Sequence, residues 1–322
     1  MLHRYGQTVV AIDSLMFGLE GVTAVYYLPA PRPALIETAP AACLESVLEG
    51  LAEEGVRSLD WIIVTHMHLD HAGAVGHLAR RFPTARVVVR AEGAPHLTDP
   101  RRLWASAARL FPDIERRFGR MRAVPAERID PVSSDGHVAD LGDGRTLEAI
   151  HIPGHATHQM ALLDPAADDV FVGDALGVYL PDAGLIRPAT PPPDFDLELC
   201  LESIDRLRTL SPARVFPTHF GPVPDVEAAF EEAATKLREW VAVAAEAVRA
   251  GGDLGEVTEA LSKHARSGEA ELAPAVAAKL EEAMPCELNA LGIVRYLTRS
   301  GGTSAGGRRA GGARPDGEEI AG

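Results

Sequence analysis

Imidazole and carboxylate side chains are concentrated in one short stretch, residues 64–78, which reads VTHMHLDHAGAVGHL. Its HMHLDH core contains His66, His68, Asp70 and His71. Imidazole nitrogen and carboxylate oxygen are ligands of zinc and similar divalent metals, which need several ligands converging on one point. Residues two apart in an extended segment point the same way, so His66 and His68 could meet at one ion. A turn after them could aim Asp70 and His71 at a second ion.

Three later segments place further candidate ligands beside glycine at the ends of apolar, strand-like runs. IPGHATH contains His155, FVGDALG contains Asp174 and FPTHFGP contains His219. The seven residues form two groups around one shared carboxylate: His66, His68 and His155 for one ion, Asp70, His71 and His219 for the other, and Asp174 between them. This pattern predicts a two-metal site, in which the ions typically lie about 3.5–4 Å apart.

The elements that must position these residues are short apolar strands. The run LDWIIVTH, which precedes the first motif, is apolar on both faces, as in a sheet covered by other layers. Small residues in the following AGAVG let the chain bend tightly into a helix. Strand-like runs fall in two groups, residues 7–90 and 146–218, with helical patterns between and after them. The pattern predicts an α/β (α+β) fold of two mixed sheets packed face to face with helices outside.

The same pattern divides the chain into parts. Residues 1–225 are expected to form the catalytic domain, with a helical insertion at about 94–124 that interrupts the rhythm of the strands. Residues 226–300 are expected to form a C-terminal helical region. Residues 301–322 are rich in glycine and polar side chains, which predicts a disordered tail.

The chain contains, in this order, the HxHxDH motif, a lone histidine after PG, a GD aspartate and a final histidine at a strand end. This series of motifs resembles that of the metallo-β-lactamase-fold hydrolases. The resemblance covers about residues 7–225. It implies an αββα sandwich with two divalent metal ions, foremost zinc with iron or manganese as alternatives, at one edge of the sheets. Aspartate rather than cysteine at position 174 is similar to the glyoxalase II-like branch and unlike true two-zinc β-lactamases. The resemblance assigns the seven residues to the metals as grouped above.

The activity that the resemblance implies is metal-assisted hydrolysis. Asp70 is the predicted catalytic residue, which would orient the attacking hydroxide and then pass a proton to the leaving group. The leading hypothesis is cleavage of a thioester or related ester, as in hydroxyacylglutathione hydrolase-like enzymes. Alternatives are a phosphodiester or lactone hydrolase, a mononuclear iron persulfide dioxygenase, and a non-catalytic, metal-stabilised binding module.

Residues outside the metal motifs are expected to determine the substrate. Arg187 could meet an anionic group, and Trp104 and Tyr296 could line an apolar pocket wall. His158 and Glu37 could hold metal ligands in the required orientation.

Composition limits the partners and the compartment. A net charge of −15 disfavours binding to nucleic acid, and no 18-residue apolar window suggests a membrane span. Three cysteines that lie far apart predict a reducing compartment without disulfides, and no segment resembles a signal peptide. We therefore expect a cytoplasmic enzyme that acts on a small molecule, with the apolar helices of its second half able to form a homodimer.

Overall fold

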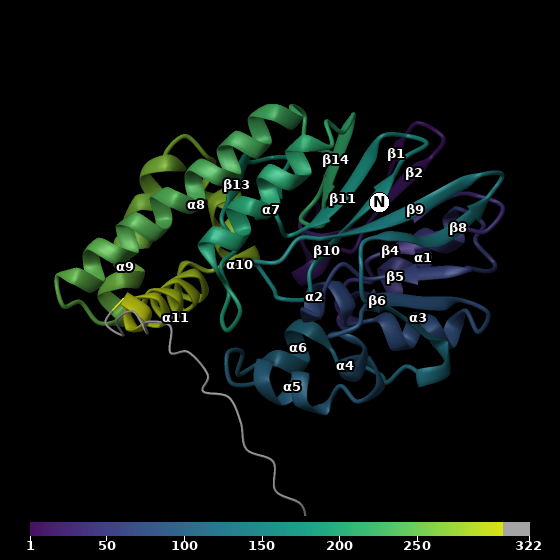
Figure 1. Cartoon of the computed structure of the whole chain (residues 1–322), viewed down its shortest axis with the longest axis horizontal. Coiled ribbons are helices and arrows are strands. Elements are labelled where there is room, and N and C mark those ends of the chain that lie inside the picture. Colours follow the sequence, from purple (N-terminus) through teal and green to yellow (C-terminus); the bar gives the residue numbers. More distant parts are fainter. Residues whose placement is uncertain (305–322) are drawn as a thin grey trace, which may run out of the picture.

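The computed structural model describes residues 1–304 of the chain (Figure 1). Helix α11 (Cys286–Ser304) includes residues 301–304 of the predicted tail, and the remainder of that segment lies outside the described residues. No helix in residues 1–304 is long and apolar enough to cross a membrane.

Two mixed sheets contain most of the strands in the described part of the chain. The first has the order β1-β2-β3-β4-β5-β6-β7, antiparallel from β1 to β4 and parallel from β4 to β7. Its strands are β1 (Leu2–Tyr5), β2 (Val9–Asp13), β3 (Ala24–Leu28), β4 (Ala34–Ile36), β5 (Trp61–Ile63), β6 (Arg86–Arg90) and β7 (Ile129–Val132).

The second sheet has the order β14-β11-β10-β9-β8, in which only the β11–β14 pair is parallel. Its strands are β8 (Gly136–Gly142), β9 (Arg145–His151), β10 (Met160–Asp164), β11 (Asp169–Gly173) and β14 (Arg214–Pro217). A separate hairpin consists of β12 (Val178–Leu180) and β13 (Leu185–Arg187).

The two sheets enclose one apolar layer because alternate residues of each strand point inward. On β3, Tyr26 faces the second sheet, with its ring centroid 5.3 Å from that of Phe171 and 5.4 Å from that of Phe216. The intervening Val25 points the other way, into the layer between the first sheet and its helices. The hydroxyl of Tyr26 donates a hydrogen bond to the backbone oxygen of Pro217, which ties the two sheets together next to β14.

Helices cover the outer face of each sheet. Helices α1 (Leu44–Glu53) and α3 (Val75–Arg81) bury their apolar faces against the first sheet. Helices α7 (Leu197–Thr209) and α8 (Val226–Arg249) cover the second. The predicted αββα sandwich is confirmed.

An aspartate caps the N-terminus of α7 and of α8. Asp196 accepts a hydrogen bond from the backbone N–H of Leu199, and Asp225 accepts one from the backbone N–H of Ala228.

The remaining helices lie at the ends of the sandwich. Helices α9 (Leu254–Gly268) and α11 share a buried core with α7 and α8, whereas α10 (Pro274–Ala283) packs near β12. Helix α2 (Leu69–Ala72) follows β5, and the insertion comprises α4 (Ala94–Thr98), α5 (Arg101–Ala107) and α6 (Ile114–Phe118). Short 3-10 helices occupy Met16–Gly18, Ala41–Cys43 and Ala126–Arg128. Figure 1 shows the helices of the insertion grouped below α2, at the bottom of the view.

Candidate metal centre

The structure brings all seven predicted metal ligands together where chain segments leave the carboxyl ends of strands. His66 and His68 follow β5, and Asp70 and His71 lie in the single turn of α2. The other three come from the second sheet: His155 follows β9, Asp174 follows β11 and His219 follows β14. Parallel strands end at the same edge of a sheet, so the sandwich itself gathers these loops.

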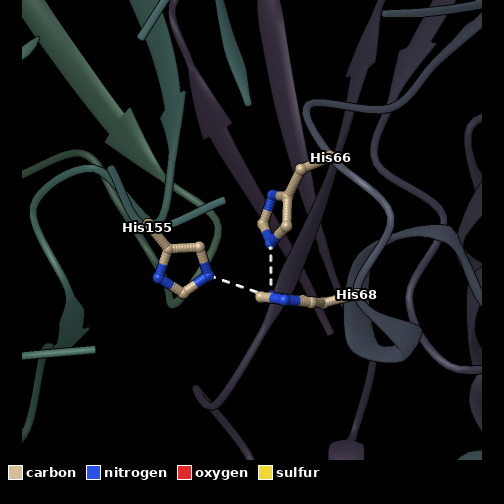
Figure 2. Close-up of side chains that lie close together, drawn as sticks. All are labelled: His66, His68 and His155. Carbon is tan, nitrogen blue, oxygen red and sulfur yellow. Dashed lines mark hydrogen bonds between the residues drawn. The ribbon is translucent and has the colours of Figure 1, made fainter. Parts of the chain in front are cut away.

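Three imidazoles form the first group. The Nε2 of His66 and the Nε2 of His155 lie 3.0 Å and 2.9 Å from the Nδ1 of His68. Figure 2 shows the three rings turned toward one point from two different parts of the chain. Their ligand atoms all lie within 4.8 Å of one another. Such a facing set of ring nitrogens is the arrangement that a metal ion with three histidine ligands requires.

The second group contains Asp70, His71, Asp174 and His219, again with ligand atoms within 4.8 Å of one another. The Nε2 of His71 lies 3.3 Å from Asp174 Oδ1 and 3.6 Å from Asp70 Oδ2. The Nε2 of His219 lies 3.5 Å from Asp70 Oδ2.

Asp174 connects the two groups. Its Oδ2 lies 3.4 Å from the Nε2 of His155, which belongs to the first group, and 3.7 Å from the Nε2 of His219, which belongs to the second. Its Oδ1 faces His71. A carboxylate in this position could touch both ions of a dinuclear centre.

Backbone carbonyls fix the orientation of two ligand rings. The Nδ1 of His155 donates to the oxygen of Ala189 at 3.0 Å, and the Nδ1 of His219 donates to the oxygen of Val22 at 3.2 Å. A carbonyl oxygen can only accept, so the proton sits on Nδ1 and the lone pair of Nε2 points into the site. This is the tautomer that a metal needs from each ring.

Glu37 lies behind the second group and holds it in place. Its Oε1 accepts hydrogen bonds from the hydroxyls of Thr65 at 2.5 Å and Thr218 at 2.9 Å, and lies 3.1 Å from His71 Nδ1. The Glu37 backbone has φ of 67°, a strained conformation for a residue with a side chain. The backbone N–H of Glu37 donates to the oxygen of Ile63, while its side chain orients the ring of His71.

A glycine before Asp174 allows the two sheets to approach at the site. Gly173 has φ of 57°, and a Cβ built there would lie 2.7 Å from Thr65 Oγ1 and 3.2 Å from Gln159 Oε1. A larger residue would be strained and would push on the threonine that binds Glu37.

Burial and neighbouring charges set the ionisation of the ligands. Burial, and then the nearby His155, lowers the pKa of His68 to about 3, and burial with the adjacent imidazoles puts the pKa of His66 far below its ordinary value. Burial alone would raise the pKa of Asp70, but His71 and His219 outweigh it and hold this pKa at about 2. The neutral imidazoles of His66 and His68 and the ionised carboxylate of Asp70 are the forms that bind metal ions, whereas Asp174 raises the pKa of His71 and of His219 despite their burial.

Several polar atoms of the site have no hydrogen-bond partner within the described chain. His71 Nε2, His219 Nε2 and Asp174 Oδ1 are buried and make no hydrogen bond, although His71 Nε2 and Asp174 Oδ1 lie 3.3 Å apart. Leaving a buried polar atom unpaired costs about 1–3 kcal/mol, so groups of them indicate a missing ligand. All three atoms point into the second group, and their chemistry, nitrogen and carboxylate oxygen, fits a divalent metal ion.

A cavity of about 540 Å³ opens onto the two groups. His68, Asp70, His155 and Asp174 form part of its wall, so both groups are reachable from it. Residues 101–111, here called the roof, form another part, through Arg102, Leu103, Ser106, Ala107, Leu110 and Phe111. A larger cleft of about 940 Å³ contains none of the seven ligands. The smaller cavity is therefore the place where a substrate could meet the metal centre.

A family model described as the metallo-beta-lactamase superfamily matches residues 29–219, which is more than half of the chain and includes all seven ligands. The chain belongs to the metallo-beta-lactamase superfamily. The predicted family resemblance is confirmed.

Relatives within the superfamily include proteins with different names. The chain is 32% identical over 169 residues to the metallo-beta-lactamase fold-containing protein ST1585 of Sulfurisphaera tokodaii, a match that covers 51% of this chain and 62% of that relative. It is 28% identical to a hydroxyacylglutathione hydrolase of Synechococcus, a match that covers 65% of this chain and 73% of that relative. It is 25% identical to an atrochrysone carboxyl ACP thioesterase of Aspergillus fumigatus, a match that covers 57% of this chain and 45% of that relative.

Solved structures of superfamily members share the fold. The archaeal protein ST1585 from Sulfolobus tokodaii aligns with a TM-score of 0.66 at 23% identity, covering 90% of this chain and 99% of that one. A metallo-beta-lactamase family protein from Thermus thermophilus aligns with a TM-score of 0.61 at 21% identity, covering 87% and 89%. At these identities the likeness shows the fold alone.

The three residues predicted to contact substrate do not line the cavity in the described structure. Arg187 is buried, with its guanidinium 2.7 Å from Glu269 and 2.8 Å from Glu281. Trp104 packs on the side of α5 toward Pro100 and Arg120. The Tyr296 hydroxyl donates to Glu198, and the substrate contacts of all three residues stay predictions.

The two residues predicted to support the ligands lie beside them. Glu37 contacts His71 as described above. His158 lines the cavity, and its ring centroid lies 6.5 Å from that of His66. Sequence reasoning missed Thr65 and Thr218, which donate to Glu37. The sequence did contain a signal for these two residues, because each threonine directly precedes a candidate ligand histidine at a strand end, in VTH and in PTH.

Proposed function

We propose that the protein is a hydrolase that uses two divalent metal ions to cleave a thioester or a related ester. The observation that carries the proposal is the position of Asp174, whose oxygens face His71, His155 and His219 and so reach both ligand groups. The names of two relatives, a hydroxyacylglutathione hydrolase and an ACP thioesterase, support the choice of substrate class.

Seven side chains would hold the ions. One ion would take its ligands from the three-histidine group, the other from Asp70, His71 and His219, and Asp174 would serve both. Neutral imidazoles with carboxylates suit zinc best, with iron and manganese as alternatives. Two bound cations would lower the pKa of water toward neutrality and polarise a carbonyl oxygen.

The chain's own residues supply the rest of the chemistry. Asp70 lines the cavity, and its ionised carboxylate could accept a proton from the attacking water. The same carboxylate could then give that proton to the departing thiolate or alkoxide. Thr65, Thr218 and Glu37 keep the His71 ring in position throughout.

The chemistry proposed here fits a small-molecule enzyme of the cytoplasm. The three cysteines are unpaired and buried in the described structure, as expected in a reducing compartment. Burial raises the pKa of the Cys43 thiol to about 11, so this cysteine is a poor nucleophile at neutral pH.

Metal content measured together with turnover tests the proposal. The protein is loaded with zinc, iron or manganese, and its metal is counted by mass spectrometry. Hydrolysis is then compared on acetyl thioesters, a phosphodiester and a lactone. We expect two metal ions per chain and fastest turnover of the thioester. One iron per chain without hydrolysis, or faster cleavage of the phosphodiester or lactone, would contradict it.

A further inference from the structure

The wall of the cavity away from the metal ligands is mainly apolar and comes from three distant parts of the chain. The roof contributes Leu103, Ala107, Leu110 and Phe111, and α6 adds Phe118. Met16, Phe17 and Met67 form a second apolar surface. Ala283, Met284 and Leu288, at the end of α10 and in α11, form a third. Such a surface gains free energy when it is covered by an apolar group.

The size of the cavity exceeds what a small acyl group needs. Its volume of about 540 Å³ lies within the range of roughly 300–1,000 Å³ that is typical of sites for whole drug-sized ligands. An acetyl or lactoyl group would leave most of the apolar wall in contact with water.

Few charges in the cavity remain available to a charged substrate. Arg117 is 2.7 Å from Glu282, and its guanidinium also lies over the ring of Phe17, 4.4 Å from the centroid. Glu92 pairs with Arg90 at 3.3 Å. Apart from the metal ligands, Arg102 and Asp194 are therefore the charged side chains of the described cavity wall that lack an ion pair. A glutathione thioester carries two carboxylates and one ammonium group, and Arg102 would be the one arginine of the described cavity wall without an ion pair to meet either carboxylate.

We propose that the substrate carries a large, uncharged apolar acyl group, which packs between the roof and residues 283–288. This inference rests on the proposed hydrolase function and names the substrate class of that site. The carbonyl carbon lies at the metal centre, and water replaces the thiol or alcohol on it. The products are a carboxylic acid with an apolar chain and the free thiol or alcohol.

A series of thioesters with one neutral thiol, N-acetylcysteamine, tests the inference on the metal-loaded protein. Acetyl, hexanoyl and decanoyl thioesters are compared with lactoylglutathione. We expect kcat/KM to rise by about fourfold per methylene until the cavity is filled, or by roughly 250-fold over the four methylenes from acetyl to hexanoyl. Equal kcat/KM along the series, or fastest cleavage of lactoylglutathione, would overturn the inference.

A charge in the roof should remove this preference. Leu110 is 38% exposed in the roof, and Leu199, on α7 outside the cavity, is 36% exposed, so either position should accept aspartate without unfolding. We expect Leu110→Asp to lower the ratio of decanoyl to acetyl kcat/KM by about tenfold or more, since it places a carboxylate against the chain. The matched Leu199→Asp should leave the ratio unchanged. Equal ratios in the two variants would contradict the assignment of the roof.

A binding measurement separates this inference from the proposed function. The amide analogue of the decanoyl thioester cannot be cleaved readily, and its binding is measured by calorimetry beside that of the acetyl amide. Tight binding of the decanoyl amide without hydrolysis of any thioester would remove the hydrolase proposal and keep the apolar site. Hydrolysis of the acetyl thioester with no tighter binding of the decanoyl amide would keep the hydrolase proposal and remove the apolar site.

Discussion

The part of the cavity wall that carries the candidate metal ligands, here called the metal side, differs from the roof in how deeply its residues are buried. His66, His71 and His219 are completely buried, and each lies two to eight residues beyond the end of a strand, β5 or β14. By contrast, none of the residues of α5 (Arg101–Ala107), all of them described, is buried. The sandwich thus fixes the candidate metal ligands, whereas the lightly packed helix α5 of the insertion forms part of the opposite cavity wall. The same scaffold can thus serve different substrates when only the insertion changes.

Replacing Asp70 should have the largest effect on activity. Asp70→Asn keeps the size of the side chain but removes the charge that faces His71 and His219. We expect kcat/KM for a thioester to fall on the order of 10³-fold, with the unfolding temperature nearly unchanged. Steady-state kinetics and thermal unfolding followed by circular dichroism measure the two effects.

Asp194→Asn is the control for that substitution, because Asp194 lines the same cavity but lies in neither ligand group. It should lose far less activity than Asp70→Asn. If both variants lost activity equally, the carboxylate at position 70 would have no special part in the reaction.

Glu37→Gln should weaken the metal side without touching a ligand. The new amide offers an NH2 group to a site that already contains the donors Thr65 and Thr218, so His71 would lose part of its support. We expect metal affinity to fall by about 10–100-fold, measured by competition with a chromophoric chelator. Glu45→Gln, at an exposed position on α1, is the control. Unchanged affinity in Glu37→Gln would mean that the metals alone orient the ring.

The metal side was also the part that sequence could predict. Its ligands occur in short motifs directly after apolar strands, so local spacing already places His66 and His68 on one side of the chain. The β8 strand was missed because it includes glycine, aspartate and exposed residues, and its pattern lacks a long apolar run. The edge strand β1 was missed for a similar reason, since its LHRY sequence is half polar.

The substrate contacts could not be predicted because they depend on partners far along the chain. Arg187 looked available in the sequence, yet Glu269 and Glu281 neutralise it from 82 and 94 residues away. The tyrosine at 296 pairs with Glu198 in the same way. Pairing at such separations is set by the packing of the C-terminal helices, which local patterns do not specify.

Gly173→Ala should damage the metal side through the backbone. Its left-handed conformation costs about 1–2 kcal/mol for alanine, and crowding against Thr65 should add about 1–3 kcal/mol. Gly184 has φ of 63° and nothing within 4 Å of a built Cβ, so Gly184→Ala measures the cost of the left-handed backbone without crowding. Urea denaturation should therefore show a larger loss for Gly173→Ala than for Gly184→Ala, and only the former should lose metal affinity. Equal losses would mean that the approach of the sheets at Thr65 is not tight.

The smallest effect should come from the roof. Leu35 on β4 is fully buried, and Leu35→Ala should lower the free energy of unfolding by about 2–5 kcal/mol. Leu110, with 38% of its surface exposed, has much less to lose, so Leu110→Ala should cost no more than about 0.5–1 kcal/mol. Urea denaturation of the metal-loaded protein measures both. A cost for Leu110→Ala as large as that for Leu35→Ala would place the roof within the core, and the substrate surface would then be as fixed as the metal side.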